Sequence, residues 1–196
     1  MEIVRLRPEQ LAEASAVLAR AFQDDPAWGW VLPDPGRRAA LLPWLFRMGF
    51  EITDADVWTT PGVVRGAARW LPPGRPPLRL GAALFAFVST PLRLREATTR
   101  FLAYGRAVEN MRVRATPGPH WYLAGIGVDP PDQRKGIGSA LLAPGLEGAA
   151  AEGLPCVLLT NAERNLDFYR HHGFEVVLEE EAPSGAPRAW ALVRRP

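Results

Sequence analysis

A short glycine loop between an apolar strand and a helix is the feature that most constrains the fold of this chain. The pattern from Trp121 to Val128 predicts a strand, and the segment from Gly136 to Glu152 predicts a helix that stops at Gly153. Residues 133–138 between them read Gln-Arg-Lys-Gly-Ile-Gly. Glycine lets a ligand approach the backbone, and the first amides of a helix are unpaired and favour anions. The loop is therefore suited to a phosphate or a pyrophosphate.

Two common phosphate-binding templates do not fit this loop. A P-loop needs a longer glycine spacing followed by Lys and Ser or Thr, whereas Ile137 and Gly138 follow Gly136 directly. A dinucleotide-binding fingerprint needs a third glycine where Leu141 stands. The remaining alternative is a glycine-rich helix start without a ligand, so the surrounding elements have to decide.

The C-terminal third of the chain alternates predicted strands and helices. Strands are expected at Pro155 to Thr160, Phe174 to Glu180 and Arg188 to Val193, and a helix at Glu163 to His172. This order predicts an α/β sheet with parallel pairing in this region.

The N-terminal part predicts a strand at Ile3 to Arg7 and then a helix that opens at Pro8 and ends at Asp24-Asp25-Pro26. An apolar loop is expected from Trp28 to Leu32, and a second helix is expected to start at Pro35. These elements precede the strands and insertion described next.

Two strands around a turn are expected at Asp56 to Thr60 and Val63 to Leu71. Prolines then interrupt the chain, and residues 72–119 are interpreted as a helical insertion within one domain that spans residues 1–196. Within it, the stretch from Leu78 to Arg114 has a helical pattern with a break at residues 89–91.

Composition excludes several classes of protein. The single cysteine, Cys156, rules out a disulfide framework and a Cys-rich metal site. A net charge of +2 is too small for a nucleic-acid coat, and no apolar run reaches the roughly 20 residues of a membrane span. The first five residues start like a strand and show no signal-peptide pattern, so the chain is interpreted as a cytoplasmic protein with neither a nucleic-acid nor a membrane partner. The excess of 22 arginines over one lysine, Lys135, does not identify a partner.

The context of the loop resembles the GNAT superfamily of acetyl-CoA-dependent N-acetyltransferases. Gln133, Gly136 and Gly138 match its acyl-CoA signature, and Asn165 and Tyr169 follow after the next strand. From residue 120 onward the chain is most similar to the puromycin N-acetyltransferases of that superfamily. The resemblance implies a GNAT-like fold, in which helices flank a mixed, mostly antiparallel central sheet and the helical insertion precedes the CoA-binding strand.

The same resemblance implies a role for particular residues. The loop amides would bind the CoA pyrophosphate, and the main chain of the preceding strand would pair with pantetheine as with an added strand. Tyr169 would act as the general acid for the leaving thiolate, with a purely structural tyrosine as the alternative. The residues implied for cofactor binding are Ile126, Gly127, Val128, Gln133, Arg134, Lys135, Gly136, Ile137, Gly138, Ser139 and Asn165; helix capping is the alternative for Asn165.

The acceptor side is less constrained by the sequence. Asp25, Trp28, Trp30 and His120 are the candidates for a substrate pocket, with core packing or a surface turn as alternatives. Cys156 fits a buried strand better than a covalent nucleophile. Candidates for the base that deprotonates the amine are Asp24, Asp25, Glu109, His120 and Asp129.

The resemblance implies an enzyme that moves acetyl from acetyl-CoA to a primary amine, and direct attack in a ternary complex is the simplest mechanism for it. The acceptor would be a small molecule or a protein amine, no metal is expected, and a homodimer is consistent with the resemblance. The alternative is a non-catalytic acyl-CoA-binding or regulatory module on the same fold.

Overall fold

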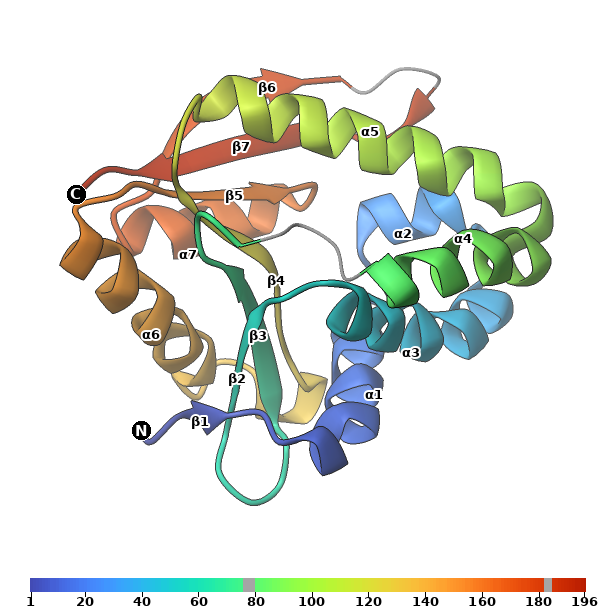
Figure 1. Cartoon of the computed structure of the whole chain (residues 1–196), viewed down its shortest axis with the longest axis horizontal. Coiled ribbons are helices and arrows are strands. Elements are labelled where there is room, and N and C mark those ends of the chain that lie inside the picture. The colour runs from blue at the N-terminus through green and yellow to red at the C-terminus, as the bar shows by residue number, and fades with distance from the viewer. Residues whose placement is uncertain (76–79, 182–184) are drawn as a thin grey trace.

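The structure is a computed structural model that describes residues 1–75, 80–181 and 185–196. A seven-stranded sheet in the order β1-β2-β3-β4-β5-β7-β6 forms its centre, and helices cover both faces (Figure 1). The strands are β1 (Val4–Arg5), β2 (Asp56–Thr59), β3 (Gly66–Leu71), β4 (Trp121–Val128), β5 (Cys156–Thr160), β6 (Glu175–Glu180) and β7 (Ala189–Arg194). The longer strand expected from residue 63 begins three residues later.

Strand β4 pairs in parallel with β5, and every other pair of neighbouring strands in the sheet is antiparallel. The prediction of a mixed, mostly antiparallel sheet is therefore confirmed. The expectation of parallel pairing in the C-terminal third is correct for β4 and β5 but wrong beyond them, because β7 lies between β5 and β6 and runs antiparallel to both. An antiparallel return needs only a short connection, whereas a parallel strand needs a crossover.

Two helical layers cover the sheet. Alternation along β3 divides its side chains, since Trp70 packs beneath α6 and α7 whereas Ala67 packs against α1 on the opposite face. Strand β7 alternates in the same way, with Leu192 on the α7 side and Ala191 beside Met111 of α5. The helices are α1 (Leu11–Ala21), α2 (Pro26–Val31), α3 (Pro35–Ile52), α4 (Leu80–Leu94), α5 (Thr98–Ala115), α6 (Ile137–Glu152) and α7 (Leu166–His171).

The expected apolar loop after the first helix is wrong, because residues 26–31 form helix α2. The carboxylate of Asp25 accepts hydrogen bonds from the amides of Ala27 and Trp28, at 2.9 and 3.3 Å, and Pro26 occupies the first helical position. An Asp N-cap followed by Pro is a helix start. The Asp-Asp-Pro sequence therefore begins a helix directly after α1 has ended.

The predicted insertion contains α4 and α5, which lie side by side over the sheet and α3 (Figure 1). The break expected at residues 89–91 is displaced, since α4 continues through Pro91 and the chain turns instead at the short 3-10 helix η2 (Arg95–Ala97). Arg95 adopts a left-handed φ of 52°, which ends the regular helix there. The predicted interruption at residues 76–79 lies outside the described residues.

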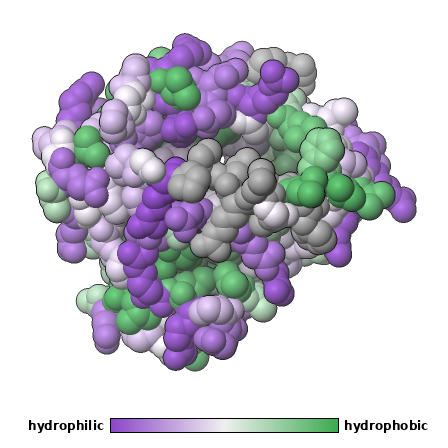
Figure 2. Space-filling model, in the orientation of Figure 1, coloured by the Kyte–Doolittle hydropathy of each residue, from purple (hydrophilic) through white to green (hydrophobic). Residues whose placement is uncertain are grey.

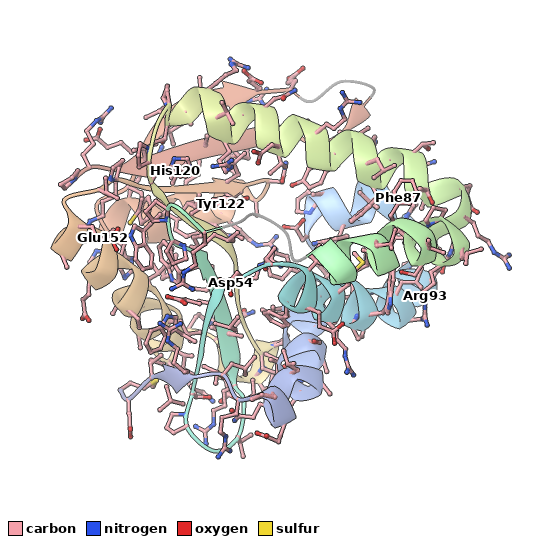
Figure 3. All side chains as sticks on the ribbon, in the orientation of Figure 1. Asp54, Phe87, Arg93, His120, Tyr122 and Glu152 are labelled. Atoms are coloured by element: carbon pink, nitrogen blue, oxygen red, sulfur yellow. The ribbon has the colours of Figure 1, made fainter. Side chains whose placement is uncertain are left out.

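Helix α4 carries apolar side chains on its outer surface. They form a green patch on the right of Figure 2, where Figure 3 places Phe87. The exposed apolar residues of this helix are Leu84, Phe87, Val88 and Leu92. Their spacing of three and four residues places them along one helical face.

Candidate functional site

Strands β4 and β5 separate partway along β4. Their parallel pairing runs from Trp121 to Leu123 and then stops, whereas β3 stays paired with β4 as far as Val128. Beyond Leu123, the main chain of β4 therefore has one edge with no strand partner among the described residues. Such an edge can pair with the amide groups of an extended ligand.

The glycine loop continues directly from this open edge. Gly136 has a left-handed φ of 80° and is the N-cap of α6, with no side chain capping the helix. Arg134 also has a positive φ, of 61°. The side-chain amide of Gln133 donates to the Val128 carbonyl at 3.1 Å and ties the loop to the end of β4. The first amides of α6 thus remain available for an anion at the positive end of the helix dipole.

A cavity of about 440 Å³ lies between the loop, the open edge of β4, and α7. At Gly138 it is bounded by the Phe168 ring, which lies 3.3 Å from the position of a Cβ. A larger residue at this position would therefore press on the ring. The residues that line the cavity are Ala21, Phe22, Asp25, Ile126, Gly127, Val128, Gln133, Arg134, Gly136, Gly138, Ser139, Arg164, Asn165, Phe168 and Tyr169.

A second cavity, of about 340 Å³, lies between the sheet and helices α2, α3 and α5. Aromatic and aliphatic side chains supply most of its walls, including Trp28, whose ring contacts those of Phe46 and Phe101. Its polar lining residues are Asp25, Thr53, Arg69, Tyr104, Tyr122, Thr160, Asn161, Asn165 and Tyr169.

The two cavities share the same residues at one end. Phe22 and Asp25 come from the segment between α1 and α2, Ile126 from the open edge of β4, and Asn165 and Tyr169 from the start of α7 and from α7 itself. A group held in the first cavity can therefore face a group held in the second. We refer to these five residues as the junction.

Asp25 is the carboxylate of the junction. One of its oxygens caps α2, and the other receives no hydrogen bond from any described residue. Burial raises the pKa of Asp25, and its two backbone hydrogen bonds and the charge of Arg164 oppose this effect. A buried carboxylate with a free oxygen can hold a cation or accept a proton.

Tyr169 is the phenol of the junction. Its side chain is only 7% exposed, and its hydroxyl makes no hydrogen bond with any residue that the structure describes. Burial, followed by the negative charge of Asp25, raises the pKa of the Tyr169 hydroxyl. The hydroxyl is therefore protonated at neutral pH and can donate a hydrogen bond into the cavities.

Four of the residues predicted for the site do not line either cavity. Lys135 forms an ion pair with Asp132 at 2.8 Å, and the Ile137 side chain is buried in the core beneath α6. Trp30 lies two residues beyond Trp28 on α2, which turns it about 200° around the helix axis and away from the cavity. The prediction that both tryptophans line one pocket therefore holds for Trp28 but not for Trp30.

His120 also lies away from the junction, at the start of β4 (Figure 3). It precedes Ile126 by six residues, which is about 20 Å along an extended strand. Its Nδ1 lies 2.7 Å from the Gly118 carbonyl, and its other ring nitrogen contacts Arg112. Burial lowers the pKa of His120. This position argues for a turn residue rather than a pocket residue.

The structure also separates the candidate bases. Glu109 pairs with Arg112, and Asp129 pairs with Arg20 at 2.6 Å, so both carboxylates already have a cationic partner. Asp24 is exposed and lines neither cavity. Of the five candidates, Asp25 alone lines the junction.

Several polar residues that line the second cavity are not among the site residues predicted from the sequence. Tyr104 donates a hydrogen bond to Asn161, and burial raises the pKa of its hydroxyl. Tyr122 lies near the middle of the molecule (Figure 3), and Arg69 lies in β3. No local motif marks these residues, because helices and strands that are distant in sequence bring them together.

In residues 1–75, 80–181 and 185–196, no group of three or more His, Cys, Asp or Glu side chains could hold a metal ion. Over the same residues, no helix has the length and hydropathy needed to span a membrane.

A mixed sheet that opens between two parallel strands, with a glycine loop leading into a helix, can hold an extended ligand that carries a phosphate. Residues 70–174, just over half of the chain, match the model of the Acetyltransferase (GNAT) family. The chain belongs to this family.

Solved structures of acetyltransferases share the fold at low sequence identity. A histone acetyltransferase HPA2-related protein from Corynebacterium glutamicum is 19% identical, with a TM-score of 0.69, and the match covers 99% of this chain and 95% of that one. The ribosomal-protein-alanine N-acetyltransferase of Brucella melitensis is 18% identical, with a TM-score of 0.56 and complete coverage of both chains. The ribosomal-protein-S18-alanine N-acetyltransferase of Escherichia coli is 15% identical, with a TM-score of 0.54 and coverage of 99% and 92%.

Proposed function

We propose that this protein transfers an acetyl group from acetyl-CoA to a primary amine by direct attack, with both substrates bound at once. The observation that carries the proposal is the junction, where two cavities of different character meet over Asp25 and Tyr169. Members of the family use acetyl-CoA. A thioester at the end of the first cavity would face an amine that enters from the second.

The lining of the first cavity suits acetyl-CoA. The uncapped amides of α6 and the Arg134 side chain offer positive charge to the pyrophosphate. The open edge of β4 at residues 126–128 offers main-chain groups to the pantetheine amides, and Asn165 lies beside it. Lys135, although paired with Asp132, is on the same loop and is exposed enough to meet a phosphate.

The junction residues supply the proton transfers that the reaction needs. Attack by the neutral amine forms a carbon–nitrogen bond and breaks the carbon–sulfur bond. A nitrogen that enters as an ammonium therefore loses two protons, one before attack and one as the amide forms, and the sulfur gains one. The second proton from the nitrogen replaces the one that Tyr169 would give to the sulfur. The free oxygen of Asp25 would hold the ammonium and take its proton, directly or through water, helped by the raised pKa. The Tyr169 hydroxyl would donate to the departing sulfur, whose ordinary thiol pKa is near 8.5.

Direct attack is favoured over an acyl-cysteine intermediate. Cys156 is 2% exposed, packs in the core beneath α6, and lines neither cavity. Burial raises the pKa of the Cys156 thiol to about 11, so the thiolate needed for nucleophilic catalysis is scarce at neutral pH.

The acceptor class follows less directly from the geometry. The aromatic walls of the second cavity suit a small-molecule amine. The predicted similarity of the C-terminal third to puromycin N-acetyltransferases would also favour a small-molecule acceptor. The names of the Brucella and Escherichia relatives, which specify protein alanine acceptors, support a protein amine instead. A panel that contains both kinds of amine separates these acceptors.

A homodimer in the cytoplasm, without nucleic-acid or membrane partners, completes the proposal. The exposed apolar face of α4 supports self-association, because a two-fold dimer can cover the same patch on both copies. Phe87→Glu, which places a charge in the centre of this patch, should shift the protein toward the monomer in sedimentation experiments.

The deciding experiment measures free thiol released from acetyl-CoA across the amine panel. Turnover with at least one amine, and acetylated product identified by mass, supports the enzyme. A non-catalytic acyl-CoA-binding module predicts CoA binding without thiol release from any amine. Cys156→Ala provides the mechanistic control, and its full turnover is expected for direct attack.

A further inference from the structure

Arg69 brings a positive charge to the second cavity without a counter-ion. It extends from β3 and lines the cavity, yet it makes no hydrogen bond and no ion pair with any residue in the described ranges. Burial lowers the pKa of its guanidinium, and the Tyr122 phenol opposes this effect. A guanidinium nevertheless remains charged at physiological pH, so a cation without a partner lies at this end of the cavity.

Helix α3 leaves space for this side chain. Gly49 lies beside Arg69, and a Cβ at Gly49 would overlap Nη1 of the guanidinium. The glycine lies in the last turns of α3, where it costs helix stability relative to alanine. The close packing of α3 on β3 therefore depends on position 49 having no side chain, which leaves room for the guanidinium.

The carboxylates around the cavity do not neutralise Arg69. Asp25 lines the same cavity, but it does not pair with Arg69: the positive charge that lowers the pKa of Asp25 is that of Arg164. On the neighbouring strand, Asp56 is held by Arg5 at 2.5 Å and by Arg75 at 2.7 Å. Because an unpaired buried charge is costly, a ligand that supplies an anion at Arg69 would gain affinity from the existing arrangement.

We propose that Arg69 binds a carboxylate of the acceptor, so that the preferred substrate is an amine that also carries a carboxylate. The inference rests on the proposed function, because it assigns the second cavity to the acceptor. One guanidinium matches a carboxylate in charge and in its two-pronged geometry, whereas a phosphate dianion would keep an uncompensated charge.

The rest of the cavity indicates how the two ends of the acceptor are joined. The register of β3 and β4 places Arg69 opposite Gly125, one residue before Ile126 of the junction, and its guanidinium also interacts with Tyr122, which lies nearer the start of β4. Apolar side chains such as Leu45 and Phe101 line the cavity. An acceptor with an apolar spacer between amine and carboxylate fits this arrangement.

The test compares ω-amino acids of graded chain length with their uncharged primary amides. For the best length, kcat/KM for the acid should exceed that for the amide by about 10- to 100-fold. Arg69→Gln should bring this ratio to about 1, and Gly49→Ala should lower it by displacing the guanidinium while keeping its charge. Arg65→Gln is the matched control, because Arg65 is exposed and lines neither cavity, and it should leave the ratio unchanged.

A ratio near 1 in the unaltered protein, or a ratio that survives Arg69→Gln, overturns the inference. Thermal melting shows whether Arg69→Gln is folded. If it is not, the acid-to-amide ratio of kcat/KM in Gly49→Ala decides the inference. If no amine releases thiol, the proposed function fails. Calorimetric binding of the same acids and amides to the CoA-loaded protein then decides the inference alone, with tighter binding of the acids that depends on Arg69 as the supporting result.

Discussion

The indole of Trp70 in β3 occupies the space that a side chain on Gly145 of α6 would need. A Cβ at Gly145 would overlap the indole ring, whose neighbour in the core is Trp121 at a ring-centroid distance of 6.4 Å. Gly148 leaves similar space for Trp121 one turn later. Two glycines thus let the C-terminal half of α6 lie close to the sheet.

Overpacking costs up to about 3 kcal/mol, and Gly145→Ala should reach the upper end of that cost because the buried indole has no room to move. Alanine gains roughly 1 kcal/mol over glycine in a helix, so the free energy of unfolding should fall by about 1–2 kcal/mol. Gly105→Ala in α5 is the matched control, since nothing lies within 4 Å of its Cβ position, and it should raise the free energy of unfolding. Urea denaturation of the two variants checks both signs; a stabilised Gly145→Ala would contradict the packing argument.

The sequence signals for the glycine-loop side of the candidate site are local. Gln133, Gly136 and Gly138 lie within six residues, and a strand before them and a helix after them were both visible as apolar patterns. The structure brings these residues to one cavity. Because these residues are so near one another in the sequence, the pattern alone was enough to predict that they lie together; their binding of CoA stays a prediction.

The acceptor side could not be predicted in the same way. Arg69 and Gly49 are twenty residues apart, and only the packing of α3 on β3 brings them together. The Asp-Pro sequence at residues 25–26 fits the end of one helix and the start of the next equally well. With α2 unrecognised, Trp28 and Trp30 could not be assigned to different faces.

Gly136→Glu should weaken CoA binding at least 10-fold, because it places a carboxylate among amides that face the pyrophosphate and strains a left-handed residue. Gly153→Glu is the matched control, since Gly153 is also left-handed, at φ 65°, but ends the same helix far from the cavity. Both variants should lose stability, whereas calorimetry should detect weaker CoA binding in Gly136→Glu alone. Equal CoA affinities would contradict the assignment of the loop.

Asp25→Asn should stabilise the protein in a pH-dependent way. Burial raises the pKa of Asp25, so the folded protein holds this proton more tightly than the unfolded chain. Stability is therefore lost as pH rises from the ordinary carboxyl range through the raised pKa. Asparagine cannot ionise and still caps α2.

The stability of Asp25→Asn relative to the unaltered protein should increase across this pH window and then level off, as measured by urea unfolding at a series of pH values. Turnover of Asp25→Asn should be lower than that of the unaltered protein, because the variant lacks the carboxylate proposed as the base. Asp34→Asn is the control, since Asp34 caps α3 at an exposed position. A difference that does not change with pH would contradict the electrostatic explanation.

Tyr169→Phe should lower kcat by about 100-fold or more while CoA affinity changes little. The variant removes one hydroxyl that has no partner in the described part of the protein, so neither a hydrogen bond nor core packing is lost on folding. Its free energy of unfolding should therefore equal or exceed that of the unaltered protein. Tyr104→Phe is the matched control, because the Tyr104 hydroxyl donates to Asn161 within the fold, and its loss should reduce stability more than chemistry. Rapid-quench measurement of the first turnover separates acetyl transfer from product release, and an unchanged transfer rate in Tyr169→Phe would remove this hydroxyl from the mechanism.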